Sequence, residues 1–158
     1  MAGSIYSSVP DLNVDPTRLI ELTDNASAPG VVDTSVTDST SLDAQDVIDR
    51  RLEGTYVVPF TAGNVPPAIR RLHSKIWKRM LYERRDAMQV PKAVEDDYAR
   101  ALDDLEDYAT PGDGGRFLLG AQQHSGAGQA ASAGAFSSDP DDNNPVVRLF
   151  GRAKDRLG

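Results

Sequence analysis

Two neighbouring stretches of the chain, residues 68–86 and 94–109, combine helical apolar spacing with opposite net charge. The first holds seven bases and two acids, and the second holds seven acids and one base. In both, apolar residues recur every three or four positions, which is typical of a helix that packs one face against a partner. A short loop separates the two stretches, so we expect an antiparallel helical hairpin whose apolar faces meet.

Helical periodicity also predicts which side chains form these faces. On the first helix, opened by Pro66-Pro67, the predicted apolar residues are Ile69, Leu72, His73, Ile76, Trp77 and Met80. On the second helix, which begins near Pro91 and is stopped by Thr110-Pro111-Gly112, they are Val94, Tyr98, Ala101, Leu102, Leu105, Tyr108 and Ala109. The charged side chains then lie on the outer surfaces of the hairpin.

The remaining N-terminal sequence predicts two more helices. Asp15-Pro16 is a strong start signal for a short helix over 17–22, because Asp caps a helix and Pro suits its first position. A longer helix is expected from about Asp38 to Glu53 and ends at Gly54. Residues 55–66 should be extended or looped, since Pro59 is incompatible with a central strand. The predicted fold class is therefore all-α: a small helical bundle with a long antiparallel hairpin, extended loops and a flexible C-terminal tail.

Apolar residues are unevenly spread, and this divides the 158-residue chain into three parts. Residues 1–119 form the predicted helical domain. Residues 120–144 hold too few apolar side chains to offset their ordering entropy and are predicted to be a flexible linker. Residues 145–158 regain apolar side chains with four bases against one acid, which suggests a docking tail; a frayed terminus is the alternative. The tail residues that we expect to dock are Val146, Val147, Arg148, Leu149 and Phe150.

Composition and motifs argue against several kinds of activity. The chain has no cysteine and two histidines, which excludes disulfide scaffolds, Cys-ligated zinc and thiol catalysis. A net charge of −7 disfavours coating of nucleic acid, and no apolar run is long enough to span a membrane. No nucleotide-binding motif or catalytic constellation is found, and His73 is predicted to be a packing histidine. We therefore predict a non-enzymatic soluble protein without catalytic residues, cofactor or metal, made in a reducing compartment.

The charged faces of the hairpin allow two readings. They could be solvated faces whose fields partly cancel within one molecule, or surfaces that meet the opposite charge on a neighbouring copy in a ring. For the second reading the candidate interface residues are Arg71, Lys75, Lys78, Arg79, Asp96, Asp103, Asp104 and Asp107. A small DNA-binding regulator that uses helix 68–86 is the alternative function, although the neighbouring acidic helix would repel phosphates.

In the order of several short sequence motifs, the chain resembles the Mu-type phage head–tail joining (adaptor) proteins. The N-terminal motifs are Tyr6 to Leu12 and Leu19-Ile20-Glu21-Leu22-Thr23-Asp24, and they are followed by Ile48-Asp49 with Leu52 and Tyr56. The later motifs are Val65 to Arg71, Leu81 to Arg85, and Tyr98 with Ala101, Leu102 and Leu105. The resemblance covers about Tyr6 to Leu119, and it is carried by the order of these motifs.

This resemblance implies a structural role. Such proteins attach beneath the portal at the head–tail junction (neck) of the virion, after synthesis in the cytoplasm of the bacterial host. They are expected to form a ring of about twelve copies. Genomic DNA passes through the ring without sequence-specific binding, and a downstream neck or tail-terminator protein attaches below. The implied partners are therefore further copies of the chain, the portal and the next neck protein, with no membrane and no catalytic residues.

Overall fold

The computed structural model describes residues 4–24, 29–85, 89–110 and 116–124 of the chain, and this part is helical. Its elements are η1 (Val9–Leu12, a 3-10 helix), α1 (Pro16–Thr23), α2 (Thr34–Leu52), α3 (Pro67–Glu83) and α4 (Lys92–Ala109). The described residues contain no β-strand, and a single antiparallel bridge joins Tyr56 to Gln123. The all-α class predicted from the periodicity is confirmed.

Aspartate caps fix where the first two α-helices begin. The Asp15 carboxylate accepts hydrogen bonds from the backbone N–H of Thr17 at 2.9 Å and of Arg18 at 3.3 Å, as its sequence context predicts. Asp33 caps α2 in the same way through Ser35 and Val36. The prediction that α2 begins near Asp38 was therefore wrong by about one turn.

The cause of this error is the run of hydroxyl residues at the start of α2, which are poor helix formers in isolation. Thr37 Oγ1 donates to the carbonyl of Thr34 at 2.9 Å, and Thr40 Oγ1 donates to that of Val36 at 2.7 Å. Both side chains and Ser41 are buried in the protein. Capping and tertiary burial thus outweigh the low intrinsic propensity of this turn.

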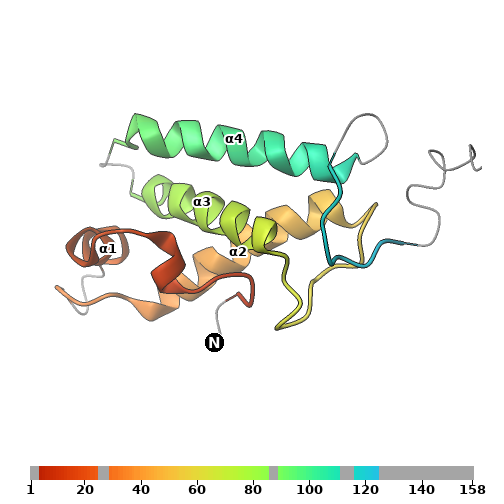
Figure 1. Ribbon diagram of the computed structural model, residues 1–158. Coiled ribbons are helices and arrows are strands. Elements are labelled where there is room, and N and C mark those ends of the chain that lie inside the picture. The colour runs from red at the N-terminus through yellow and green to blue at the C-terminus, as the bar shows by residue number, and fades with distance from the viewer. Residues whose placement is uncertain (1–3, 25–28, 86–88, 111–115, 125–158) are drawn as a thin grey trace, which may run out of the picture.

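Helix α3 lies at the centre of the molecule and contacts α4, α2, η1 and α1 (Figure 1). Its buried side chains are Ile69, Leu72, His73, Ile76, Trp77, Leu81 and Tyr82. Leu81 lies off the predicted apolar stripe and is nevertheless fully buried, since α3 is covered on more than one side. Met80, predicted on the stripe, is only partly buried.

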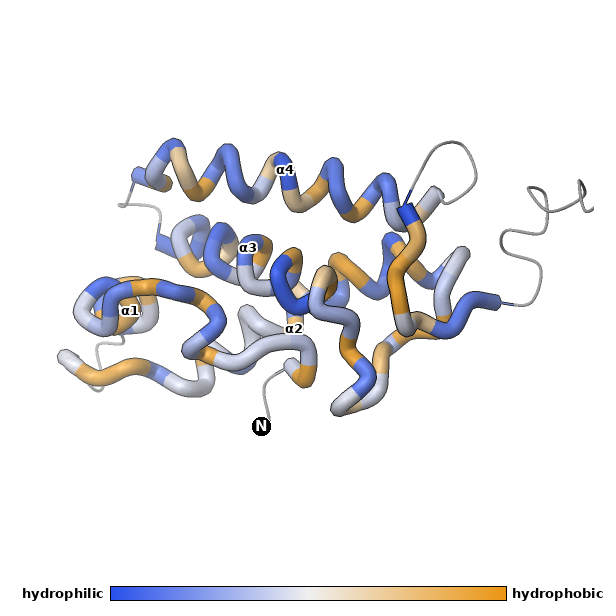
Figure 2. Tube along the Cα trace, viewed as in Figure 1, coloured by the Kyte–Doolittle hydropathy of each residue, from blue (hydrophilic) through white to orange (hydrophobic). Residues whose placement is uncertain are grey.

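Helix α4 runs alongside α3 in the opposite direction and forms an outer layer (Figure 1). Hydrophobic positions of α4 recur along the edge that faces α3, whereas its far edge is hydrophilic (Figure 2). Only Ala101 and Leu105 are fully buried. The other predicted face residues, including Val94, Tyr98 and Leu102, are partly buried against the core. The apolar stripe of α4 is thus wider than the surface that α3 and α2 cover.

Two polar networks anchor the N-terminal residues in the core. The Tyr6 hydroxyl is fully buried, donates to the carboxylate of Asp49 on α2 and accepts the Phe60 N–H at 3.0 Å. Burial, together with the bond to Asp49, raises the pKa of Tyr6 well above its usual range. Ser7 Oγ lies 2.5 Å from His73 Nδ1. Residues 4–12 are therefore attached to both α2 and α3 by side-chain hydrogen bonds.

Residues 116–124 return to the domain after α4 and pack on it. The N–H of Val57 donates to the Gln122 carbonyl at 2.8 Å, and the N–H of His124 donates to the Thr55 carbonyl at 3.0 Å. Leu118 is buried, and its N–H donates to the Tyr56 hydroxyl at 3.1 Å. The packed part of the chain thus extends past Gly120, where the linker was predicted to begin. The predicted tail, residues 145–158, lies outside the described residues.

Two kinds of feature, a membrane-spanning helix and a metal-binding cluster, are absent from the residues that the structure describes. No helix among them has the length and apolarity needed to cross a membrane. They also contain no cluster of three or more histidine or acidic side chains that could hold a metal ion.

Candidate subunit interface

The candidate interface is the charged surface formed by α3, α4 and residues 116–124. Arg79 is the most enclosed of its charges: its side chain is 18% exposed, and its guanidinium lies 2.9 Å from Glu95 on α4 and 3.1 Å from Glu83 on α3. It also lies over the ring of Tyr98, with 5.8 Å between guanidinium carbon and ring centroid. The ion pair with Glu95 raises the pKa of Arg79 above its usual value. Arg79 is therefore held within its own chain.

The two lysines of the predicted set are bound more loosely. Lys75 Nζ lies 3.8 Å from Asp97 Oδ1, across the α3–α4 contact. Lys78 Nζ donates to the backbone carbonyl of Asn13 at 3.4 Å, next to η1. An exposed ion pair such as Lys75–Asp97 contributes only about 0.2–1 kcal/mol, so Lys75 can exchange its partner at small cost.

Arg116, which follows α4 in the chain, holds two of the predicted acidic residues. Its guanidinium donates to the carboxylate of Asp104 and, at 2.9 Å, to that of Asp107. Its backbone N–H also donates to the Asp107 carbonyl at 2.9 Å. These contacts raise the pKa of Arg116, with Asp107 as the larger cause. They fasten the start of residues 116–124 to the last turns of α4.

Three of the predicted residues have side chains that make no ion pair or hydrogen bond with the residues that the structure describes: Arg71, Asp96 and Asp103. All three are exposed. Asp96 and Asp103 are seven positions apart on α4, so they lie two turns apart on one outward face. Arg71 lies on α3 and lines a hollow together with Tyr108 of α4. These charges remain available for another molecule.

The observed pairs differ in their members from the predicted set. Asp97 and Glu95 neutralise Lys75 and Arg79, and Arg116 neutralises Asp104 and Asp107. The sequence analysis had singled out none of Glu95, Asp97 and Arg116. In the sequence these three residues appear only as charges at helical spacing. Which charges form ion pairs depends on how α4 is rotated against α3, and the sequence does not show this rotation. The predicted tail residues Val146, Val147, Arg148, Leu149 and Phe150 lie outside the described residues.

A groove also lies at this edge of the molecule, between the start of α3, the end of α4 and residues 116–119. It consists of two adjoining hollows of about 340 and 280 Å³ that share Ala68, Arg71 and Tyr108. We call it the α3–α4 groove. Sequence reasoning missed it, because residues 117–119 had been assigned no role.

The fold and this surface together define a small all-α protein with a charged helical exterior and a groove at one edge. The chain belongs to the family described as "Bacteriophage Mu, Gp36", which it matches over residues 6–138. The resemblance to a Mu-type phage family is thereby confirmed, and the protein is a phage-family protein. No curated protein matches the chain significantly.

Proposed function

We propose that the protein is a head–tail connector (adaptor) of a tailed phage, and that it works as a structural part without catalytic activity. It forms a ring of about twelve copies below the portal, at the neck of the virion. Genomic DNA passes through the ring without sequence-specific binding, and the tail or the next neck protein attaches to it. The observation that carries this proposal is the family match over residues 6–138.

The distribution of charge supports contact between neighbouring copies. Within one chain, Arg71 on one edge and Asp96 and Asp103 on the outward face of α4 have no ion-pair partner among the described residues. A head-to-tail ring brings different surfaces of successive copies together, so one copy's base can meet the next copy's acids. Such pairs mainly set orientation and register. Apolar contacts must then supply most of the affinity.

Charge reversal on the ring tests this arrangement. Arg71→Glu and Asp103→Lys should each reduce ring formation on portal-bearing heads, and the combined variant should restore it because the signs again complement each other. Sedimentation and electron microscopy of the particles measure the outcome. Lys92→Glu is a control at an exposed base outside the predicted pairs. Unchanged assembly in both single variants would refute this pairing.

The tail provides the second attachment in this proposal. Val146, Val147, Leu149 and Phe150 bury apolar surface on the portal or on a neighbouring copy, while Arg148 adds charge. Deletion of residues 145–158 should leave a folded protein that no longer joins portal-bearing heads. If the truncated chain joins heads normally, the tail has no docking role.

The alternative, a DNA-binding regulator that uses residues 68–86, has less support. Lys75 and Arg79 lie next to Asp97 and Glu95, so a DNA backbone approaching them also meets acidic side chains. α3 is moreover enclosed by α1, α2, α4 and η1, which leaves it poorly placed to enter a groove of DNA. A gel-shift assay at physiological salt tests this alternative.

A further inference from the structure

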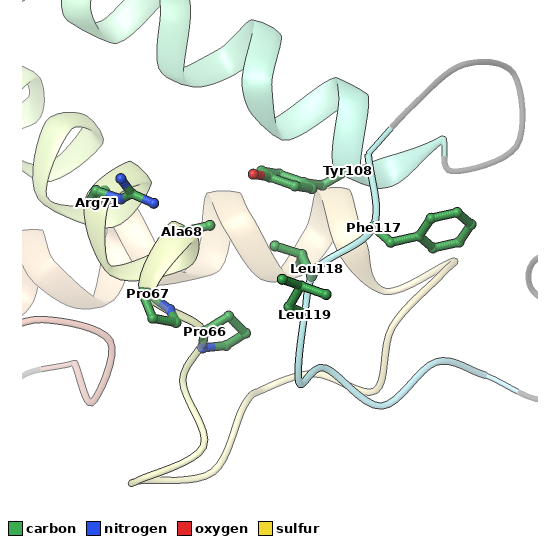
Figure 3. A pocket seen from close by; sticks show the side chains of 8 residues that line it. All are labelled: Pro66, Pro67, Ala68, Arg71, Tyr108, Phe117, Leu118 and Leu119. Carbon is green, nitrogen blue, oxygen red and sulfur yellow. The ribbon is translucent and has the colours of Figure 1, made fainter.

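The α3–α4 groove has one apolar end and one charged end. Pro66, Pro67, Phe117 and Leu119 line the apolar end. Arg71 lies where the two hollows meet, and Lys75, Asp104 and Arg116 line the charged end, where Arg116 pairs with Asp104. In Figure 3 the side chains of Ala68, Tyr108 and Leu118 point toward the space between α3 and α4, whereas the Phe117 ring points away. The groove therefore offers an apolar surface beside Arg71, whereas the other two lining bases already have acidic partners.

Two large apolar side chains that line this end are exposed to solvent. Leu119 is 88% exposed and Phe117 is 51% exposed, although Leu118 between them is buried. Arg71 has no ion-pair partner among the described residues. Adjoining exposed apolar side chains next to an unpaired base are typical of a binding surface. The chemistry suits a segment with an aromatic residue followed by carboxylates.

Such a segment occurs once in the chain beyond His124. Phe136 is followed by Asp139, Asp141 and Asp142, and residues 125–147 contain no base. The apolar residues of the tail, by contrast, are interleaved with Arg148 and Arg152, which would be repelled by Arg71 and Lys75. The family match also extends to residue 138 and so includes Phe136, well past the last described residue. Charge complementarity thus selects residues 136–142 over the tail.

We propose that residues 136–142 bind in the α3–α4 groove of their own chain. Phe136 covers the apolar end, and Asp139 and Asp141 pair with Arg71 and the bases next to it. The dimensions agree: Pro67 and Lys75 lie about 12 Å apart along α3. An extended chain places Asp139 about 10 Å, and Asp141 about 17 Å, from Phe136. The aromatic and acidic groups are therefore spaced like the two ends of the groove.

The tether allows this contact within one molecule. Twelve residues lead from His124 to Phe136 and can span up to about 40 Å, which exceeds the length of α3, about 25 Å. A short tether gives a segment an effective concentration on the order of millimolar at a site within reach. Binding of residues 136–142 would make the tail start at a fixed edge of the domain, rather than from a free linker. This inference does not depend on the connector function; in an assembled ring, the neighbouring copy's Asp103 would compete with Asp139 and Asp141 for the exposed Arg71.

The absence of native cysteine allows a direct test on the full chain. A nitroxide on Ser137→Cys should broaden the backbone amide signals of Ala68, Arg71 and Leu119 in the ¹⁵N-labelled protein. A mixture of ¹⁵N protein without nitroxide and unlabelled protein with nitroxide should show no such broadening. A nitroxide on Asp155→Cys should broaden these signals less than the one at position 137.

Substitutions establish which groups are responsible. Phe136→Ala should lower the ratio of bound to free segment about tenfold, as expected for the loss of a buried aromatic anchor. Arg71→Glu should also release the segment, whereas Arg70→Glu, at an exposed neighbour that does not line the groove, should not. The proposal is overturned if position 137 broadens nothing, if only the mixed sample shows broadening, if position 155 has the stronger effect, or if Arg70→Glu and Arg71→Glu act equally.

Discussion

His73 Nε2 lies 2.9 Å from the backbone carbonyl oxygen of Ser41, and this bond joins the buried face of α3 to the middle of α2. A carbonyl can only accept, so Nε2 carries the proton and Nδ1 is the acceptor for the Ser7 hydroxyl at 2.5 Å. One neutral imidazole thus connects three segments of the chain. It is a packing histidine whose two nitrogens are both used.

Because the buried His73 is held neutral, the folded protein should become less stable in mild acid. Burial lowers the pKa of His73, and this outweighs the opposing effects of Ser41 and Asp11. The unfolded chain takes up a proton near pH 6.5, whereas the folded chain resists it. This contribution to stability is complete above about pH 6.5 and is lost as the pH falls toward the lower folded pKa.

His73→Phe provides the measurement. At neutral pH the variant should be about 1–3 kcal/mol less stable, because the Ser41 carbonyl and the Ser7 hydroxyl lose their partner. The difference from wild type should shrink as the pH falls, since only the wild type loses the histidine contribution. Urea unfolding at several pH values tests this, with His124→Phe at the exposed histidine as the control. A difference that stays constant with pH would contradict the prediction.

Tyr6→Phe should be markedly destabilising although it removes a single oxygen. That hydroxyl donates to Asp49 and accepts from the Phe60 N–H, and the residue is fully buried. The expected loss is about 1–3 kcal/mol in the free energy of unfolding, because the buried Phe60 N–H and the half-buried Asp49 carboxylate lose a partner. Tyr98→Phe is a matched control, since the Tyr98 ring is only partly buried. Equal stability of the two variants would mean that the Tyr6 network is replaced by water.

The adjacent residues Leu118 and Leu119 should differ strongly in their contribution to stability. Leu118→Ala should cost about 2–4 kcal/mol, because Leu118 is 4% exposed and its loss leaves a cavity. Leu119→Ala should change stability by less than about 0.5 kcal/mol at its 88% exposed position. Thermal unfolding measures both. The N–H of Val57 donates to the Gln122 carbonyl, and the N–H of His124 donates to the Thr55 carbonyl. Hydrogen exchange at these two N–H groups should accelerate only in Leu118→Ala.

The Arg79–Glu95 pair should contribute little to stability despite its 2.9 Å geometry. Glu95 is 43% exposed, so solvent screens the attraction. A double-mutant cycle with Arg79→Met and Glu95→Gln should give a coupling of about 0.2–1 kcal/mol that weakens at high salt. A larger coupling that salt does not change would show that the pair is effectively buried.

Local sequence patterns were sufficient to locate the helices and to give their charge. Apolar spacing located α3 and α4, and Asp15-Pro16 located α1, because periodicity and capping are properties of a few neighbouring residues. The same information failed at the start of α2, where burial of Thr40 and Ser41 against the rest of the protein outweighs their propensity. It also did not show that residues 120–124 pack beside Thr55–Val57.

The amino-acid sequence determines which charges the surface carries, but the packing of α4 on α3 selects which of these charges pair. A few tens of degrees of rotation about the α4 axis would bring other acids toward Lys75 and Arg79, since successive residues lie about 100° apart. Long-range contacts set that rotation, above all the burial of Ala101 and Leu105. The free charges at Arg71, Asp96 and Asp103 and the groove beside Tyr108 follow from the same packing, so no stretch of the sequence read alone could reveal them.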